Sequence, residues 1–179
     1  MIRIQNLSDE YEIRKLNERD IRDVQKICGS NPQFYLYSDA DNTEECIAAD
    51  MRALPPGKEA EDKYYIGFLR DGRMHAVMDL IDGYPDPETA FIGFFMMDAE
   101  YSGRGEGSRI VRKVCTALCE EGFQRARLCI DKGNPQSSHF WQKNGFVPVK
   151  EADRNGHIVI IADKTLQGVR QFGVSNIAG

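Results

Sequence analysis

Four stretches of the chain space their apolar residues with the period of an α-helix. Ile21, Val24 and Ile27 recur at intervals of three in the first stretch, and Asn31-Pro32 ends it. Helix caps and breakers delimit the others. The predicted helices cover residues 18–28, a stretch from Asp41, Asn42 or Thr43 to Leu54, the stretch between residues 102–108 and Gly122, and the stretch from Asn134 to Gly145.

Seven further stretches have the apolar runs of β-strands. Asp71-Gly72 separates two of these runs, and such a pair in a tight turn indicates a β-hairpin. Residues 154–157 form another candidate hairpin turn. The predicted strands cover residues 11–16, 64–69, 74–81, 89–97 and 127–130, a stretch that begins at 145–147, and residues 158–162.

The order of these elements predicts an α/β fold. A strand and two helices come first, three strands follow, and helix, strand, helix and two strands complete the chain. Hairpins before a strand–helix–strand unit predict a mixed sheet of about six to seven strands with helices on both faces. One domain is expected over residues 1–165, with a tail at 166–179 whose pattern is weak.

Composition narrows the class of protein. The 179 residues suit a single domain, and the net charge of −5 with no basic patch argues against a nucleic-acid partner. No apolar run approaches the ~20 residues of a membrane span, and no signal-peptide core begins the chain. Five scattered cysteines predict a reduced, cytoplasmic protein. The acidic balance is consistent with a cationic substrate, and equally with solubility alone.

A glycine-rich turn is the strongest chemical motif. Gly103, Gly105 and Gly107 lie between an apolar strand and an amphipathic helix, where unpaired N–H groups and the helix dipole favour an anion. Glycines would let the backbone approach a pyrophosphate closely, and Ser108 and Arg104 would add donors. A flexible loop is the alternative. The spacing fits neither a P-loop nor a dinucleotide fingerprint.

A second motif follows, with Asn134 before a helix and Gly145-Phe146 after it. Together the two motifs resemble the GNAT superfamily of N-acetyltransferases, over about residues 11–165. The cofactor motif of that family is Gln/Arg-x-x-Gly-x-Gly/Ala, and Gly105 and Gly107 match its glycines. Ser102 stands in place of Gln or Arg, so main-chain N–H groups and Arg104 are expected to carry the pyrophosphate contact.

The resemblance implies that the fourth and fifth strands splay apart and that the pantetheine arm of acetyl-CoA enters the gap. The implied activity is acetyl transfer to a primary amine by direct attack in a ternary complex. A non-catalytic acyl-CoA-binding or sensing module on the same fold is the alternative. The implied cofactor-binding residues are Phe95, Met96, Met97, Ser102, Gly103, Arg104, Gly105, Glu106, Gly107, Ser108, Asn134, Phe140 and Lys143.

A general base is needed because a lysine-like amine, with a pKa of about 10.4, starts protonated. Asp79, Asp82 and Glu88 are candidates, and each could equally be a solvated strand-end charge. Many family members protonate the leaving thiolate with a tyrosine, and Trp141 occupies that position here. An indole N–H donates a hydrogen bond but is not a usable acid, and Trp141 could equally be a packing residue.

The resemblance also implies where the acceptor binds, in loops near the first helices and the third and fourth strands. The candidate acceptor residues are Phe34, Tyr35, Tyr37, Asp82 and Tyr84. A small-molecule or peptide amine is the expected partner, without nucleic acid or membrane, and dimers are common in the family. No Cys/His cluster has metal-ligand spacing, so no metal is expected.

Overall fold

The computed structural model describes residues 1–167, which form one seven-stranded sheet in the order β1-β2-β3-β4-β5-β7-β6. The strands are β1 (Glu12–Lys15), β2 (Lys63–Arg70), β3 (Arg73–Ile81), β4 (Thr89–Met97), β5 (Arg125–Asp131), β6 (Val147–Arg154) and β7 (His157–Thr165). The helices are α1 (Ile21–Gly29), α2 (Glu44–Arg52), α3 (Glu106–Glu120) and α4 (Pro135–Lys143). Only β4 and β5 pair in parallel within this described part of the chain.

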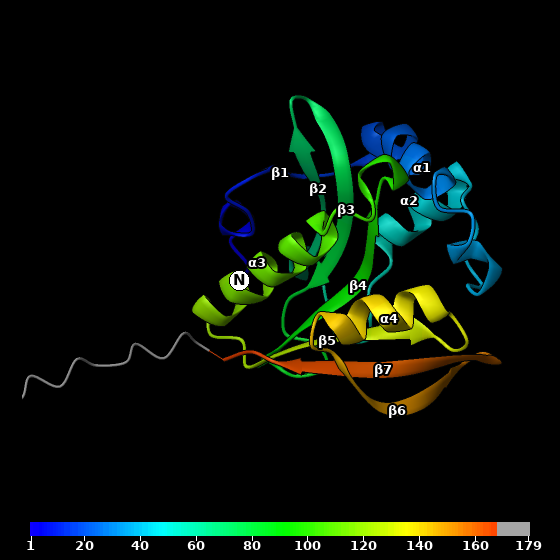
Figure 1. The fold of residues 1–179 in the computed structure, drawn as a ribbon. Helices are drawn as coiled ribbons and strands as arrows, with labels where there is room; N and C mark the ends of the chain where they lie inside the picture. The colour runs from blue at the N-terminus through cyan, green and yellow to red at the C-terminus, as the bar shows by residue number, and fades with distance from the viewer. Residues whose placement is uncertain (168–179) are drawn as a thin grey trace, which may run out of the picture.

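Helices cover the sheet on both faces, as the sequence predicted (Figure 1). On one face, Val114 of α3 and Trp141 of α4 join a core cluster with Leu128 of β5. On the other face, Val24 of α1 and Ile47 of α2 belong to a second cluster. The predicted α/β class with a mixed sheet is therefore confirmed. No helix within residues 1–167 has the length and apolar character to cross a membrane.

Both predicted hairpin turns are present. Asp71 and Gly72 have φ values of 52° and 73°, and Asn155 and Gly156 have 56° and 89°. Two consecutive residues with positive φ are the requirement of a type I′ turn, which matches the twist of paired strands. The Asn-Gly and Asp-Gly pairs therefore set the register of β2 with β3 and of β6 with β7.

The boundaries of several elements differ from the sequence prediction, and two of the differences involve specific contacts. The predicted helix at 18–28 begins as a 3-10 turn, because Asn17 and Asp20 cap each other before α1 starts. At the other end of the chain, Leu166 is buried in the core and its N–H donates to the Gln124 carbonyl at 2.8 Å. Leu166 therefore packs with the domain, and residues 168–179 of the predicted tail lie outside the described residues.

The parallel pair β4–β5 is the least complete in the sheet. It runs only from Thr89 opposite Arg125 to Ile92 opposite Leu128. From Gly93 onward β4 pairs with β3 alone, and β5 pairs with β7 alone. The two strands therefore diverge, as the family resemblance implied, and leave one edge of β4 open.

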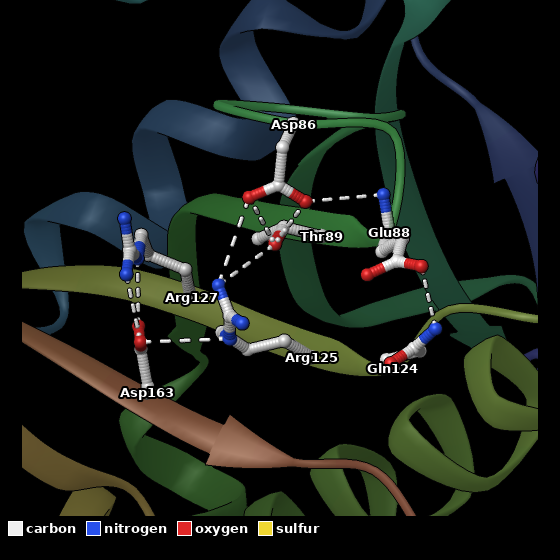
Figure 2. A network of polar contacts seen from close by, with 7 residues as sticks. All are labelled: Asp86, Glu88, Thr89, Gln124, Arg125, Arg127 and Asp163. Atoms are coloured by element: carbon white, nitrogen blue, oxygen red, sulfur yellow. Dashed lines mark hydrogen bonds and ion pairs between the residues drawn. The ribbon is translucent and has the colours of Figure 1, made fainter.

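A polar cluster holds the closed end of this divergence (Figure 2). Arg127 on β5 donates two hydrogen bonds of 2.7 Å to the carboxylate of Asp163, its cross-strand partner on β7. Arg125 lies 3.7 Å from Asp163 and 3.6 Å from Asp86. The fully buried Thr89 donates to Asp86 at 2.9 Å. Charge-assisted, bidentate contacts of this kind fix geometry as well as adding stability.

Replacing Asp163 by Ala should lower the free energy of unfolding by about 1–3 kcal/mol, because the partly buried Arg127 loses both hydrogen bonds. Urea denaturation at neutral pH measures the change. Glu151→Ala is the matched control, since the side chains of its pair with Lys132 are more than half exposed. Equal losses in both variants would contradict a special role for the cluster.

Candidate active site

A cavity of about 1150 Å³ lies where β4 and β5 diverge. Phe95 on β4 and Cys129 on β5 line it from the separated strands, and Gly105 lines it from the glycine turn. Further from the turn, Asp50 of α2 and Arg154 of β6 contribute to its walls. The cavity therefore joins the glycine turn to the segment between α1 and α2. The sequence analysis assigned the turn to acetyl-CoA and the segment to the acceptor.

The glycine turn leads directly into α3. Gly103 and Gly105 have φ values of 79° and 78°, and a Cβ at either would meet no atom within 4 Å. Gly105 is the N-cap of α3, so the unpaired N–H groups of the first helical turn begin beside the cavity. Ser102 and Ser108 line the cavity too, whereas the exposed Arg104 does not.

Gly107 has a different requirement from the other two glycines. A Cβ there would lie 2.8 Å from Met97 Sδ and 3.3 Å from the Phe140 ring. Glycine is therefore needed at this position so that α3 can pack against the end of β4 and against α4. The sequence analysis explained all three glycines by close approach to a pyrophosphate. That explanation is sufficient for Gly103 and Gly105 only.

Glu106 turns its side chain away from the cavity. Tyr11 of the N-terminal segment donates its hydroxyl hydrogen to Glu106 Oε2 at 2.6 Å, and Arg109 lies 3.9 Å from Oε1. The bond from Tyr11 lowers the pKa of Glu106, so the carboxylate stays ionised near the positive end of α3. The Glu106 side chain therefore holds the start of α3 on the side away from the cavity, and only its backbone N–H could face a ligand.

The second motif forms the opposite side of the cavity. Asn134 is buried, and its side chain caps α4 by accepting from the Ser137 N–H at 3.0 Å. Phe140 stacks on Phe95 with ring centroids 5.8 Å apart. Lys143 lines the cavity at the end of α4. The predicted cofactor residues of this motif and of β4 therefore meet across the gap.

Trp141 lines the same cavity from a buried position. Its indole is edge-on to three rings, with centroid distances of 6.0 Å to Phe95 and 5.0 Å to both Phe140 and Phe146. This aromatic cluster fixes the rotamers that shape the wall. The structure thus brings Trp141 to the site and surrounds it with apolar groups.

The open edge of β4 presents specific backbone groups to the gap. The Asp98 N–H donates to the His75 carbonyl of β3 at 2.9 Å. Because hydrogen-bonded residues alternate along an antiparallel ladder, Met96 turns its backbone groups toward β3, whereas Phe95 and Met97 turn theirs toward the open side. Asn31 donates from Nδ2 to the Met97 carbonyl at 2.8 Å. Of the three predicted residues, Phe95 and Met97 can therefore pair with a ligand.

A buried ion pair lies in the cavity wall beside a β-bulge. Asp79 Oδ2 accepts from Lys63 Nζ at 2.7 Å, with side chains only 11% and 6% exposed. The register shifts between Asp79 and Leu80, opposite Gly93, and a Cβ at Gly93 would lie 2.5 Å from Asp79 Oδ2. Gly93 therefore makes the space that the carboxylate occupies.

Burial raises the pKa of Asp79 to about 6, against the opposing effect of the Lys63 charge. Its second oxygen, Oδ1, is buried and has no hydrogen-bond partner among the described residues. Asp79 is thus ionised at neutral pH but holds a proton more readily than an exposed carboxylate. Such a group suits proton transfer near neutral pH.

The other predicted carboxylates lie elsewhere. Glu88 is exposed outside the cavity and accepts from Gln124 at 2.6 Å, as part of the polar cluster in Figure 2. Asp82 also lies outside it and forms an ion pair of 3.0 Å with the N-terminal amine of Met1. Of the candidate bases, the structure therefore brings only Asp79 to the site.

Aromatic side chains line the cavity beside Asp79. Phe34 packs edge-to-face on Tyr35 and on Phe94 of β4, with centroid distances of 5.1 and 6.0 Å. Tyr84 contacts Phe91 in the same way at 5.5 Å. Phe34, Tyr35 and Tyr84 thus lie where the sequence placed an acceptor. Tyr37 is directed elsewhere and lines a small separate hollow.

Sequence reasoning missed Lys63, Gly93 and Asn31. Gly93 had a detectable signal, because a glycine inside an otherwise apolar strand often marks a bulge or a close approach. Lys63 and Asn31 had none, since a lysine at the start of a strand and an asparagine before a proline are common surface residues. Their roles depend on partners far away in the chain.

Comparison with known proteins supports the same picture. The chain matches the sequence model of the acetyltransferase (GNAT) family over residues 11–146. A solved acetyltransferase from Thermus thermophilus superposes with a TM-score of 0.67 at 17% identity, over 87% of this chain and 96% of that one. No curated protein matches.

Two further solved structures share the fold. The PaiA N-acetyltransferase of Thermoplasma acidophilum, in complex with coenzyme A, has a TM-score of 0.59 and 20% identity over 86% of this chain and 98% of that one. The ribosomal-protein-S18-alanine N-acetyltransferase of Escherichia coli has a TM-score of 0.61 and 15% identity, over 90% of this chain and 97% of that one. With the family match over most of the chain, the diverging sheet and its glycine turn show that this protein belongs to the GNAT family of acetyltransferases.

Proposed function

We propose that this protein transfers the acetyl group of acetyl-CoA to a primary amine, by direct attack within a ternary complex. The observation that carries the proposal is the opening between β4 and β5, which has the glycine turn on one side and the buried Asp79 in its wall. Acetyl-CoA supplies an activated thioester when bound. The chain must bind that thioester, orient an amine toward it and take up one proton.

The residues around the opening fit acetyl-CoA. The N–H groups at the start of α3 and the open backbone of Gly103 and Gly105 suit a pyrophosphate. Phe95 and Met97 have backbone groups directed at the gap, which suits an extended amide-bearing arm. One N–H there would also stabilise the negative charge that develops on the thioester oxygen.

Asp79 is the proposed general base. The ammonium group first releases one proton to water, and the neutral nitrogen attacks the thioester carbon. The C–S bond then breaks, and the nitrogen loses its second proton to Asp79, directly or through one water. The pKa of Asp79, near 6, leaves it ionised at neutral pH and able to accept that proton. Lys63 holds the carboxylate in place through Oδ2, and Asp79 lines the cavity.

Trp141 is proposed to shape the thioester pocket without acting as an acid. Three phenylalanine rings surround it, and an indole has no proton to release at neutral pH. The thiolate of a thiol with a pKa of about 8.5 can leave as the anion and take its proton from water. Binding of CoA without turnover on any amine would instead favour the non-catalytic acyl-CoA module.

Gly107→Ala should weaken CoA binding roughly tenfold and cost about 1–3 kcal/mol of stability, because the added Cβ pushes α3 away from Met97 and Phe140. Calorimetric titration with CoA and urea denaturation measure the two effects. Thr116→Ala is the control: it removes only an exposed hydroxyl on α3, outside the cavity and 3.1 Å from the Arg112 carbonyl, and should change neither. Equal CoA affinity in wild type and Gly107→Ala would contradict the proposed position of the cofactor.

Asp79→Asn should lower kcat by about 10²–10⁴ with a smaller change in the KM for acetyl-CoA, as expected for loss of a general base. In the wild type, kcat/KM should fall as the pH drops below about 6, where Asp79 becomes protonated. The residual rate of the variant should lack this acidic limb. Thiol release measured across pH with a panel of amines gives both results.

Glu88→Gln tests another of the three carboxylates that the sequence offered. Because Glu88 lies outside the cavity, this variant should keep the acidic limb and a near wild-type kcat. An unchanged pH profile in Asp79→Asn, or loss of the limb in Glu88→Gln, would show that Asp79 is not the base.

A further inference from the structure

The part of the cavity beyond Asp79 has walls of opposite charge. On the side of α1 and α2, the lining residues include Asp39, Asp41 and Asp50. On the side of β6, they include Lys150 and Arg154. The acidic wall belongs to the same side as the aromatic residues described above, and the basic wall faces it from the far edge of the sheet.

The basic wall lies on the face of β6 that borders the cavity. On β6, residues at alternate positions, Lys150, Ala152 and Arg154, line the cavity. They pair across the ladder with Ile161, Val159 and His157 of β7. Val159 and Ile161 line the cavity as well, so an apolar strip separates the cations from the gap between β4 and β5.

The two cations on this wall have no partner of their own. Within residues 1–167, neither Lys150 nor Arg154 forms an ion pair, whereas the neighbouring Arg127 is held by Asp163 through two bonds of 2.7 Å. The charge of Arg154 nevertheless reaches across the cavity, because it lowers the pKa of Asp50 on the opposite wall, against the larger effect of burial, which raises it. Arg154 is thus close enough to act on a ligand in the cavity.

The acidic side also contains the proposed general base, Asp79. Asp79 is only 8% exposed, and its Oδ1 has no partner among the described residues. Oδ1 has almost no accessible surface, so a ligand amine would approach the carboxylate from the side of Asp79 that lines the cavity. The cavity therefore offers an acceptor for an amine on one side and donors for an anion on the other.

We propose that the acceptor is a primary amine that also carries a carboxylate, as in an amino acid or the amino end of a short peptide. Its amine lies against Asp79 and its carboxylate pairs with Arg154, assisted by Lys150, while its side chain packs on Phe34 and Tyr35. This inference rests on the proposed acetyl transfer and names its acceptor.

Matched amines test this assignment. L-Phenylalanine, its amide and phenethylamine share an aromatic group and a primary amine, but only the first has a carboxylate. A dipeptide of phenylalanine followed by glycine keeps the same amine and aromatic group, so it distinguishes a preference for free amino acids from a preference for peptides. kcat and KM for each are measured with acetyl-CoA in the wild type, Arg154→Gln and Lys150→Gln. Arg112→Gln is the matched control, because Arg112 is an exposed arginine on α3 outside the cavity.

The wild type should prefer the carboxylate-bearing amines, and Arg154→Gln should raise their KM by roughly tenfold or more, as expected for a charge-assisted contact. The KM for the amide and for phenethylamine should change less than about twofold, and kcat should change little for any of them. Arg112→Gln should match the wild type. Equal use of acid and amide by the wild type, or an equal loss for both in Arg154→Gln, would overturn the inference.

A binding measurement separates this inference from the proposed function. Each amine is titrated into the CoA-loaded protein by calorimetry. If no amine is acetylated, the proposed function fails, but preferential binding of the acid that Arg154→Gln abolishes would still support the assigned acceptor class. Binding of acid and amide with equal affinity, or binding of neither, would overturn the assignment whatever the turnover.

Discussion

The arrangement of the site depends on the point at which the parallel pairing of β4 with β5 stops. β4 and β5 share backbone pairing only from Thr89 to Ile92, and the polar cluster around Arg127 and Asp163 holds that closed end. Beyond it, Phe95 and Met97 keep unpaired backbone groups on the open side of β4, apart from the Met97 carbonyl that Asn31 engages. Buried N–H and C=O groups need partners, so an edge of this kind favours a ligand that extends the sheet.

Two glycines allow the side chains around this opening to approach one another. Gly93 leaves room for the Asp79 carboxylate at the bulge, and Gly107 lets α3 pack against Met97 and Phe140. The first brings the proposed base to the cavity, and the second brings the N–H groups of α3 to its edge. Both are packing requirements with consequences for chemistry, and neither depends on a left-handed backbone.

Much of this architecture could be predicted from local pattern. Asp71-Gly72 and Asn155-Gly156 predicted their hairpins, and the two motifs placed the family and the diverging strands. The roles of single side chains were harder to predict. Glu106 lies in the glycine-rich motif, but its side chain accepts a hydrogen bond from Tyr11 on the side away from the cavity. Glu88 is one residue from β4, but its side chain belongs to the polar cluster. Such choices depend on residues 36 to 95 positions away, which a local pattern does not contain.

Amide hydrogen exchange, resolved by residue, tests the central claim that acetyl-CoA binds along the open edge of β4. Saturating CoA should slow exchange at the Phe95 and Met97 N–H groups and at the first turn of α3, and should leave Met96, already directed at β3, nearly unchanged. Binding of CoA with unchanged exchange at Phe95 and Met97 would contradict the account.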